Sequence, residues 1–295
     1  MTTLPVIGVM LTQPSREGLA VRAITDFVNQ TVPRKSLYVY TTDHDYAIRL
    51  MNRFMPQLGT VFVVAARPGS TPQDMLRAGL SQARETMGYV ALWDDDIRHH
   101  PGRLERQTVQ TDDANRPSLL SSGVWHFFDS DELFVYRLDK RHEPLKVRLV
   151  GSTLVCRAER VTDDLIPVKY TGSPTHALGM SVVQRYDAVR PTDEWWWMVF
   201  GVRGDNAGGY EFHRKWATNK DRCPSAAWLR ENQVLLRHWL GQYAWDVPRL
   251  DVCGQDGVAF QFEPPTLWGP EVPPVGEPEG FERVREVLQE ETNNG

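Results

Sequence analysis

Short apolar runs and segments with helical spacing alternate along the first third of the chain. The apolar runs predicted to be buried strands are residues 5–11, 36–42, 60–66 and 89–93. The segments predicted to be helices, because apolar residues recur three and four positions apart, are residues 18–30, 45–55 and 71–87. Such regular alternation favours right-handed crossovers, and therefore an α/β fold with a mostly parallel central sheet and helices on both faces.

The pattern changes beyond about residue 121 and becomes less regular. Residues 125–138 are predicted to form a hairpin. For residues 180–186 and 194–202, periodicity leaves strand and helix open. The following glycine-rich segment, residues 201–211, is predicted to be a loop.

The last quarter of the chain has a different character. Residues 225–244 are predicted to be one helix, and residues 263–280 are rich in proline and glycine, which indicates an extended segment. We therefore expect a main domain over residues 1–222 and a helical and irregular C-terminal extension over residues 223–295.

Composition and charge restrict the class of protein. The 295 residues are 41% hydrophobic and 24% charged, which is typical of a globular protein in water. The formal net charge of -5 opposes binding to nucleic acid mainly through its phosphates. Cys156, Cys223 and Cys253 show no CxxC spacing, the N-terminus lacks a signal-peptide pattern, and no apolar run approaches the roughly 18 residues of a membrane span. We therefore expect a cytoplasmic protein.

Three adjacent aspartates, Asp94, Asp95 and Asp96, follow the fourth predicted strand directly. Ligands of parallel sheets bind beyond the carboxyl ends of the strands, which is where these residues are expected to lie. One interpretation is a solvated turn. The other is a site for a hard cation such as Mg²⁺ or Mn²⁺, with Asp94 and Asp96 pointing the same way on an extended chain and Asp95 serving as a spacer.

The sequence around the aspartates resembles the donor-binding half of family 2 glycosyltransferases, which have the GT-A fold. The residues that carry the resemblance are, in order, Gly79, Leu80, Ala83, Gly88, Tyr89, Val90, Asp94–Asp96, Pro101, Arg103 and Leu104. Residues 6–16, the Gln30-Thr31 pair and residues 37–43 also resemble the family's first strand and nucleotide loop, first helix end and second strand. The resemblance covers residues 5–107 and weakens towards about residue 220. It implies a nucleotide-sugar-binding half over residues 1–107 and an acceptor-binding half over residues 108–222.

The resemblance implies a metal-dependent, inverting transfer of a sugar from a nucleotide sugar, with a UDP-sugar expected first. It implies that Asp94 and Asp96 form a DxD motif that holds Mn²⁺ or Mg²⁺, and His213 is a candidate third ligand. The residues expected to contact the donor are Thr12, Gln13, Arg16, Asp43, Arg77, Asp94, Arg214 and Lys215. The loops after the first and second strands depart from the family pattern, so the donor sugar stays open.

An inverting transferase needs a carboxylate that deprotonates the acceptor hydroxyl. The family places it in a Glu-Asp pair, and the matching pair here is Asp193-Glu194, in reversed order. The alternative is that this pair begins a helix as its cap. The neighbouring Trp195 and Trp196, and also Trp216, are candidate acceptor-binding residues because an indole stacks on a sugar or a base, or else they belong to the core.

Several functions stay open at this point. The acceptor is a glycan, a protein, a small molecule or a hydroxymethylated pyrimidine base in phage-type DNA. A nucleotidyltransferase shares a similar sheet, but "TQPSRE" lacks the glycine-rich loop expected there. A degenerate, non-catalytic protein that binds glycans or serves as a scaffold is the alternative outside the enzymes.

Overall fold

The structure, a computed structural model, describes most of the chain up to Pro264. The described residues are 4–120, 124–135, 150–169, 173–187, 198–202, 209–219, 223–243, 245 and 247–264. They belong to one unit that ends at Pro264. None of the helices within this part of the chain is long and apolar enough to cross a membrane.

The first sheet has five strands in the order β3-β2-β1-β4-β8. Its strands are β1 (Val6–Leu11), β2 (Lys35–Thr41), β3 (Val61–Ala65), β4 (Tyr89–Leu92) and β8 (Val155–Arg157). The first four are parallel, and β8 pairs with β4 in the antiparallel direction. The predicted parallel order is therefore confirmed, and each of the four predicted strands agrees with the observed one to within a residue or two.

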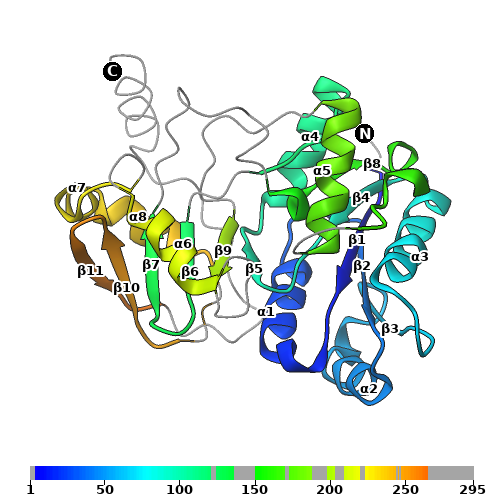
Figure 1. Cartoon of the computed structure of the whole chain (residues 1–295), viewed down its shortest axis with the longest axis horizontal. Helices are drawn as coiled ribbons and strands as arrows, with labels where there is room; N and C mark the ends of the chain where they lie inside the picture. The colour runs from blue at the N-terminus through cyan, green and yellow to red at the C-terminus, as the bar shows by residue number, and fades with distance from the viewer. Residues whose placement is uncertain are drawn as a thin grey trace. The chain divides into compact units, whose positions relative to one another are not determined.

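Helices cover both faces of this sheet, with α1 and α3 on opposite sides (Figure 1). The helices concerned are α1 (Glu17–Val28), α2 (His44–Arg53), α3 (Pro72–Glu85) and α5 (Pro174–Tyr186). Alternate residues of β1 face opposite ways: Val6 and Met10 pack with α1 and α2, whereas Ile7 and Val9 pack with α3 and α5. The expected α/β fold with helices on both faces is thus confirmed.

Two glycines allow close approach around β1. A Cβ on Gly79 of α3 would lie 2.5 Å from Cγ1 of Val9, and a Cβ on Gly88 would lie 2.1 Å from the carbonyl oxygen of Pro5. Val9 has little freedom to move aside because its side chain branches at Cβ. Two glycines that carry the family resemblance therefore have a packing reason to be glycine.

The second sheet has six strands in the order β11-β10-β7-β6-β9-β5. They are β5 (Ile97–His99), β6 (Val124–Phe127), β7 (Glu132–Val135), β9 (Met198–Val202), β10 (Leu250–Gly254) and β11 (Gly257–Phe262). Strands β6 and β7 form the predicted hairpin, and β10 lies parallel to β7. The β10-β11 hairpin was not predicted, and it joins residues beyond 223 to this sheet. The division into domains at residue 222 stays a prediction.

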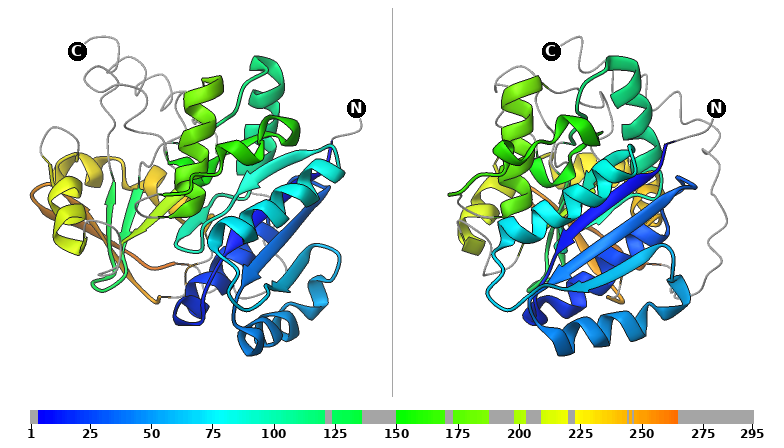
Figure 2. Two further views of the ribbon diagram at one scale, coloured as in Figure 1. Left: turned by 45° about the vertical axis from the view of Figure 1, so that its right-hand side comes forward. Right: turned by 90° about the vertical axis from the view of Figure 1, so that its right-hand side faces the viewer.

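The remaining helices correct several expectations. They are α4 (Arg103–Ala114), α6 (Gly209–Ala217), α7 (Ala226–Glu231) and α8 (Gln233–Leu240). Residues 225–244, predicted to be one helix, form two. Helix α7 ends with its C-cap, Asn232, and α8 begins at the next residue. Residues 180–186 belong to helix α5, and helix α6 begins at Gly209, inside the segment 201–211 that was predicted to be a loop. Helix α7 lies against the β10-β11 hairpin, as the left view of Figure 2 shows. Arg237 of α8 donates to the carbonyl oxygen of Gln261 in β11 at 2.7 Å.

Short 3₁₀ turns connect these elements. They are η1 (Pro14–Arg16), η2 (Met55–Gln57), η4 (Gly151–Thr153), η5 (Ala158–Arg160) and η6 (Asp163–Leu165). Two of them, η1 and η4, lie next to the three aspartates.

We expect Gly79→Ala to lower the free energy of unfolding by about 1–3 kcal/mol, because the new methyl group would force α3 away from β1. Urea denaturation measures the change. The matched control is Gly18→Ala in α1, where an added Cβ has nothing within 4 Å and should leave stability unchanged or slightly raised. Equal stability of the two variants would contradict the close approach.

Candidate functional site

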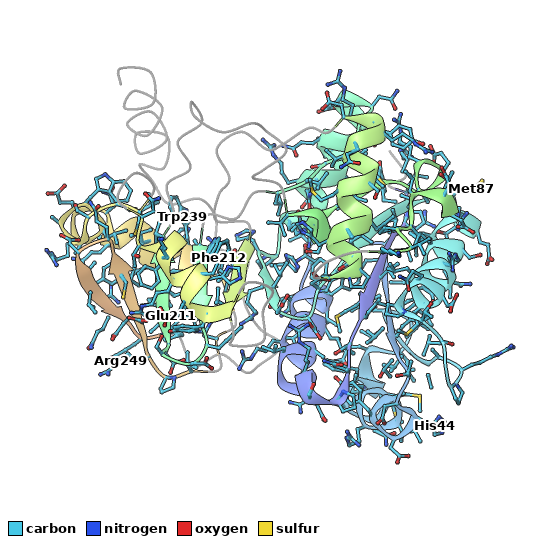
Figure 3. All side chains as sticks on the ribbon, in the orientation of Figure 1. His44, Met87, Glu211, Phe212, Trp239 and Arg249 are labelled. Carbon is cyan, nitrogen blue, oxygen red and sulfur yellow. The ribbon has the colours of Figure 1, made fainter. Side chains whose placement is uncertain are left out.

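The three aspartates lie at the point where the strand order of the first sheet reverses. β2 pairs with one side of β1 and β4 with the other. The loops that leave the carboxyl ends of β1 and β4, residues 12–16 and 94–96, therefore lie next to each other, as their hydrogen bonds show. Ligands of open α/β sheets bind at such switch points. In Figure 3, His44 marks this carboxyl edge, after β2, and Met87 the opposite edge, before β4.

Arg16 joins two of the aspartates. Its Nη1 donates to Oδ1 of Asp95 at 2.6 Å, and its Nη2 donates to Oδ2 of Asp96 at 2.8 Å. The hydroxyl of Thr12 donates to the other oxygen of Asp95 at 2.9 Å. Asp95 therefore anchors the loop after β1, and it is not a spacer. The chain turns at residues 95–96, so the alternation expected for an extended segment does not apply.

Asp94 is held separately by hydroxyl groups. Its Oδ1 accepts hydrogen bonds from Thr175 and, at 3.3 Å, from Ser173, the N-cap of α5. Ser152 of η4 also donates to the carboxylate. These donors converge because α5 packs closely on η4: a Cβ on Gly179 would lie 2.0 Å from the carbonyl oxygen of Gly151.

Burial raises the pKa of all three carboxyl groups. The pKa of Asp95 rises to about 7, chiefly by burial, with Arg16 acting in the opposite direction. Burial and then the charge of Asp94 raise the pKa of Asp96, while burial raises that of Asp94 despite its hydroxyl donors. Negative charge at this turn is thus only partly compensated, and a further cation would stabilise the ionised carboxylates.

A buried arginine lies beneath the aspartates. The guanidinium of Arg103 donates to Oε1 of Gln107 at 2.7 Å and to the carbonyl oxygen of Leu92 at 3.3 Å, and it packs over the ring of Trp93. Burial lowers the pKa of Arg103 to about 9, with Asp94 acting in the opposite direction, so the group stays charged at neutral pH. The aspartates therefore have one arginine on the loop side and another in the core.

Three other predicted donor contacts lie in different settings at the carboxyl edge. Gln13 is exposed. Asp43 is also exposed and caps α2 by accepting the N–H of Tyr46 at 2.8 Å. Arg77 lies on α3 and pairs with Asp74 at 3.1 Å, within the first turns of that helix. The role of these three residues towards a donor stays a prediction.

His213, the candidate metal ligand, and Arg214 and Lys215, the predicted donor contacts, belong to helix α6. This helix lies beside the second sheet. His213 is buried and packs against Trp125, whereas the neighbouring Glu211 and Phe212, labelled in Figure 3, are exposed. Arg214 forms a bidentate pair with Glu132 of β7 at 2.5 and 3.0 Å, and this bond raises its pKa.

Lys215 is exposed on the same helix. The side chain of Trp216, like Asp193, Glu194, Trp195 and Trp196, lies outside the described part of the chain. Among the described residues, no three His, Cys, Asp or Glu side chains are gathered so as to hold a metal ion. A third protein ligand to a cation bound by Asp94 and Asp96 therefore stays a prediction, as does the catalytic pair.

Sequence reasoning missed the residues that support the aspartates. Ser152, Ser173 and Thr175 are far from the motif in sequence and meet Asp94 only through the packing of α5 on η4. One local signal was present: Ser173-Pro174 is a helix-start pair, with serine as N-cap and proline in the first turn. It indicates where α5 begins, but not which strand end that helix meets.

Comparison with known proteins finds only a remote likeness. No family model matches the chain, and no curated protein matches it. Among solved structures, residues 1–349 of S. aureus TarS share 14% identity, with 83% of this chain and 81% of that chain covered and a TM-score of 0.49. The complex with UDP has 12% identity, the same coverage and a TM-score of 0.49. The complex with UDP-GlcNAc has 12% identity and a TM-score of 0.48, with 82% of this chain and 68% of that chain covered. A likeness of this size identifies no activity for this chain.

The pKa of Asp95 predicts a pH-dependent stability. Between the ordinary pKa of an aspartate and about 7, Asp95 is neutral in the folded protein but ionised in the unfolded chain. Its contribution to stability is therefore complete at low pH and is lost as pH rises through about 7. We expect the free energy of unfolding of the wild type, relative to Asp95→Asn, to fall by a few kcal/mol between pH 5 and pH 8.

Urea denaturation of the metal-free proteins at both pH values measures this difference. Asp74→Asn is the control, because hydrogen bonds from Thr71 lower the pKa of Asp74, which is then ionised in both states above pH 5. A wild type and an Asp95→Asn variant with the same pH dependence would rule out the raised pKa.

Proposed function

We propose that the chain is a nucleotide-sugar glycosyltransferase of the GT-A type, metal-dependent and inverting, which uses a UDP-sugar. The observation that carries this proposal is the carboxylate cluster of Asp94, Asp95 and Asp96, in which Asp95 is buried and its two neighbours are half-buried. Arg16 ties this cluster to the loop after β1 at the switch point of a parallel sheet. A switch point is where such sheets bind nucleotides. The motif resemblance over residues 5–107 supports the same class of enzyme.

The chemistry of the carboxylates fits a hard divalent cation. Carboxylate oxygens are the ligands that Mg²⁺ and Mn²⁺ prefer. The side chain of Asp96 is 13% exposed, against 1% for Asp95, so a cation can reach Asp96. The raised pKa of Asp96 supports the fit, because bound positive charge would relieve the repulsion from Asp94. We propose that Asp96 holds the ion and that Asp94 helps to hold the ion or the ribose, with His213 as a candidate third ligand.

When bound, the cation would act as a Lewis acid that neutralises the departing diphosphate. The chain itself would position the donor: Thr12 and Gln13 lie on the loop that faces the aspartates, and Asp43 and Arg77 follow the neighbouring strands. Asp193 or Glu194 would accept the proton of the acceptor hydroxyl as that oxygen attacks the sugar. Arg214 and Lys215 are proposed to contact the departing diphosphate, which would require Arg214 to leave Glu132.

The acceptor is proposed only as a hydroxyl compound. Trp195, Trp196 and Trp216 are the aromatic residues proposed to stack on it. A glycan, a protein, a small molecule and hydroxymethylated DNA all provide such a hydroxyl. The net charge of -5 favours the first three over DNA, because a duplex attracts basic surfaces.

The donor site predicts a metal-dependent increase in melting temperature. With Mn²⁺ present, one member of a panel of UDP-, GDP- and TDP-sugars should raise the melting temperature of the wild type by several degrees, as expected for a ligand that binds only the folded state. Asp96→Asn should abolish this increase. Asp163→Asn is the matched control, because that aspartate also pairs with an arginine, at 2.6 Å, but is exposed and far from the switch point in the fold. An undiminished increase in Asp96→Asn would contradict the proposed cation.

The catalytic pair predicts a loss of turnover without a loss of binding. Once the donor is known, Asp193→Asn or Glu194→Gln should reduce kcat by about 10²-fold or more, because the acceptor hydroxyl then lacks its base. Donor-induced stabilisation should be unchanged in both variants. Full turnover in both would exclude this pair as the source of the base.

A further inference from the structure

Arg16 divides its guanidinium between two carboxylates that differ in exposure. Nη1 lies 2.6 Å from Asp95, whose side chain is 1% exposed, and Nη2 lies 2.8 Å from Asp96, whose side chain is 13% exposed. Asp95 is also fixed by the hydroxyl of Thr12 at 2.9 Å. One nitrogen of the guanidinium, Nη1, therefore pairs with a buried carboxylate. The other, Nη2, pairs with a carboxylate that a ligand can reach.

The backbone that carries Arg16 is fixed, so its freedom lies in the side chain. The N–H of Arg16 donates to the carbonyl oxygen of Gln13 at 2.9 Å, Pro14 opens the 3₁₀ turn, and α1 begins at the next residue. The side chain itself is 23% exposed. Rotation about its torsions can release Asp96 without displacing the loop.

A divalent cation would compete directly with one arm of Arg16. Arg16 is a single positive charge opposite Asp95 and Asp96, whereas the nearby Asp94 is held by neutral hydroxyls. A cation on Asp96 would take over the oxygen to which Nη2 now donates and would repel the guanidinium. The released Nη2 group would then face the switch point, where the diphosphate of a donor is proposed to lie.

We infer that Arg16 is a displaceable counter-ion that couples the binding of a divalent cation to the binding of the donor's diphosphate. Without a cation, Nη2 holds Asp96. With a cation on Asp96, Nη1 stays on Asp95 and Nη2 donates to an oxygen of the diphosphate. The inference rests on the proposed function, because it requires both ligands at this site. Binding linkage is reciprocal, so each ligand should raise the affinity for the other, and Arg16 should account for part of this effect.

The test is calorimetric titration of Mn²⁺ into the full chain, with and without UDP, for the wild type and Arg16→Gln. Arg16→Gln should bind Mn²⁺ alone about tenfold more tightly, because a competing positive charge is gone. UDP should raise the Mn²⁺ affinity of this variant by about tenfold less than it raises that of the wild type.

Arg84→Gln is the matched control. Arg84 also pairs with a carboxylate, that of Asp163 at 2.6 Å, but it lies at the end of α3, near the amino edge of the sheet. It should behave as the wild type in both titrations. Arg16→Lys is the second variant, for use if Arg16→Gln has a lowered melting temperature. A single ammonium can stay on Asp95 but has no second arm, so this variant should also lose the coupling.

The possible results separate the inference from the proposed function. If Asp96→Asn removes Mn²⁺ binding while the Arg16 variants match the wild type in affinity and coupling, the inference is wrong and the metal site stands. If the wild type and Arg16→Gln bind neither Mn²⁺ nor UDP, or bind UDP without any effect of Mn²⁺, the metal-dependent function fails and the inference fails with it. If UDP binding needs Arg16 but not Mn²⁺, the arginine replaces the metal, and the displacement is again refuted.

Discussion

Three adjacent carboxylates are withdrawn from most of the solvent where the chain leaves one sheet and enters the other, Asp95 fully and its two neighbours in part. Much of the surrounding structure compensates for this loss of hydration. Asp94 follows β4 of the first sheet, and Ile97 begins β5 of the second. Removing carboxylates from water raises their pKa values and is costly unless donors or cations meet them. Arg16 meets two of them by direct ion pairs, and three hydroxyl groups meet the third.

The compensation comes from segments that are distant in sequence. The first loop brings Thr12 and Arg16 to Asp95. Helix α5 brings its N-terminus to Asp94, where the helix dipole also favours negative charge. The core beneath contributes Arg103, which is buried on neutral partners. A site that gathers donors from several elements is preorganised for an anion-bearing ligand and a cation, which is the basis of the proposed function.

The second sheet fixes the same turn from the other direction. The N–H of Gly201 in β9 donates to the carbonyl oxygen of Asp96 at 2.9 Å, and a Cβ on this glycine would lie 2.3 Å from that oxygen. Asp26 of α1 forms a buried bidentate pair with Arg98 of β5 at 2.8 and 2.9 Å. The turn is therefore held at both ends. Because the backbone of the turn is rigid, we assign the inferred change of hydrogen-bond partner, from Asp96 to the diphosphate, to the side chain of Arg16.

The sequence by itself determined the parallel core. Periodicity of apolar residues is local, so the four strands and three helices of the first third could be read from it, and with them the edge where Asp94–Asp96 lie. The local pattern of apolar residues did not predict the elements whose structure depends on packing between distant parts of the chain. Asn232 interrupts a helix that looked continuous, and β10 and β11 join a sheet whose other strands are far away in the chain. Helix α6 begins inside the predicted loop over residues 201–211. Only the tertiary structure decided how the three carboxylates are used, because Arg16 lies 79 residues before Asp95 and 80 before Asp96, and Thr175 lies 81 residues after Asp94. No local spacing records which oxygen meets which donor.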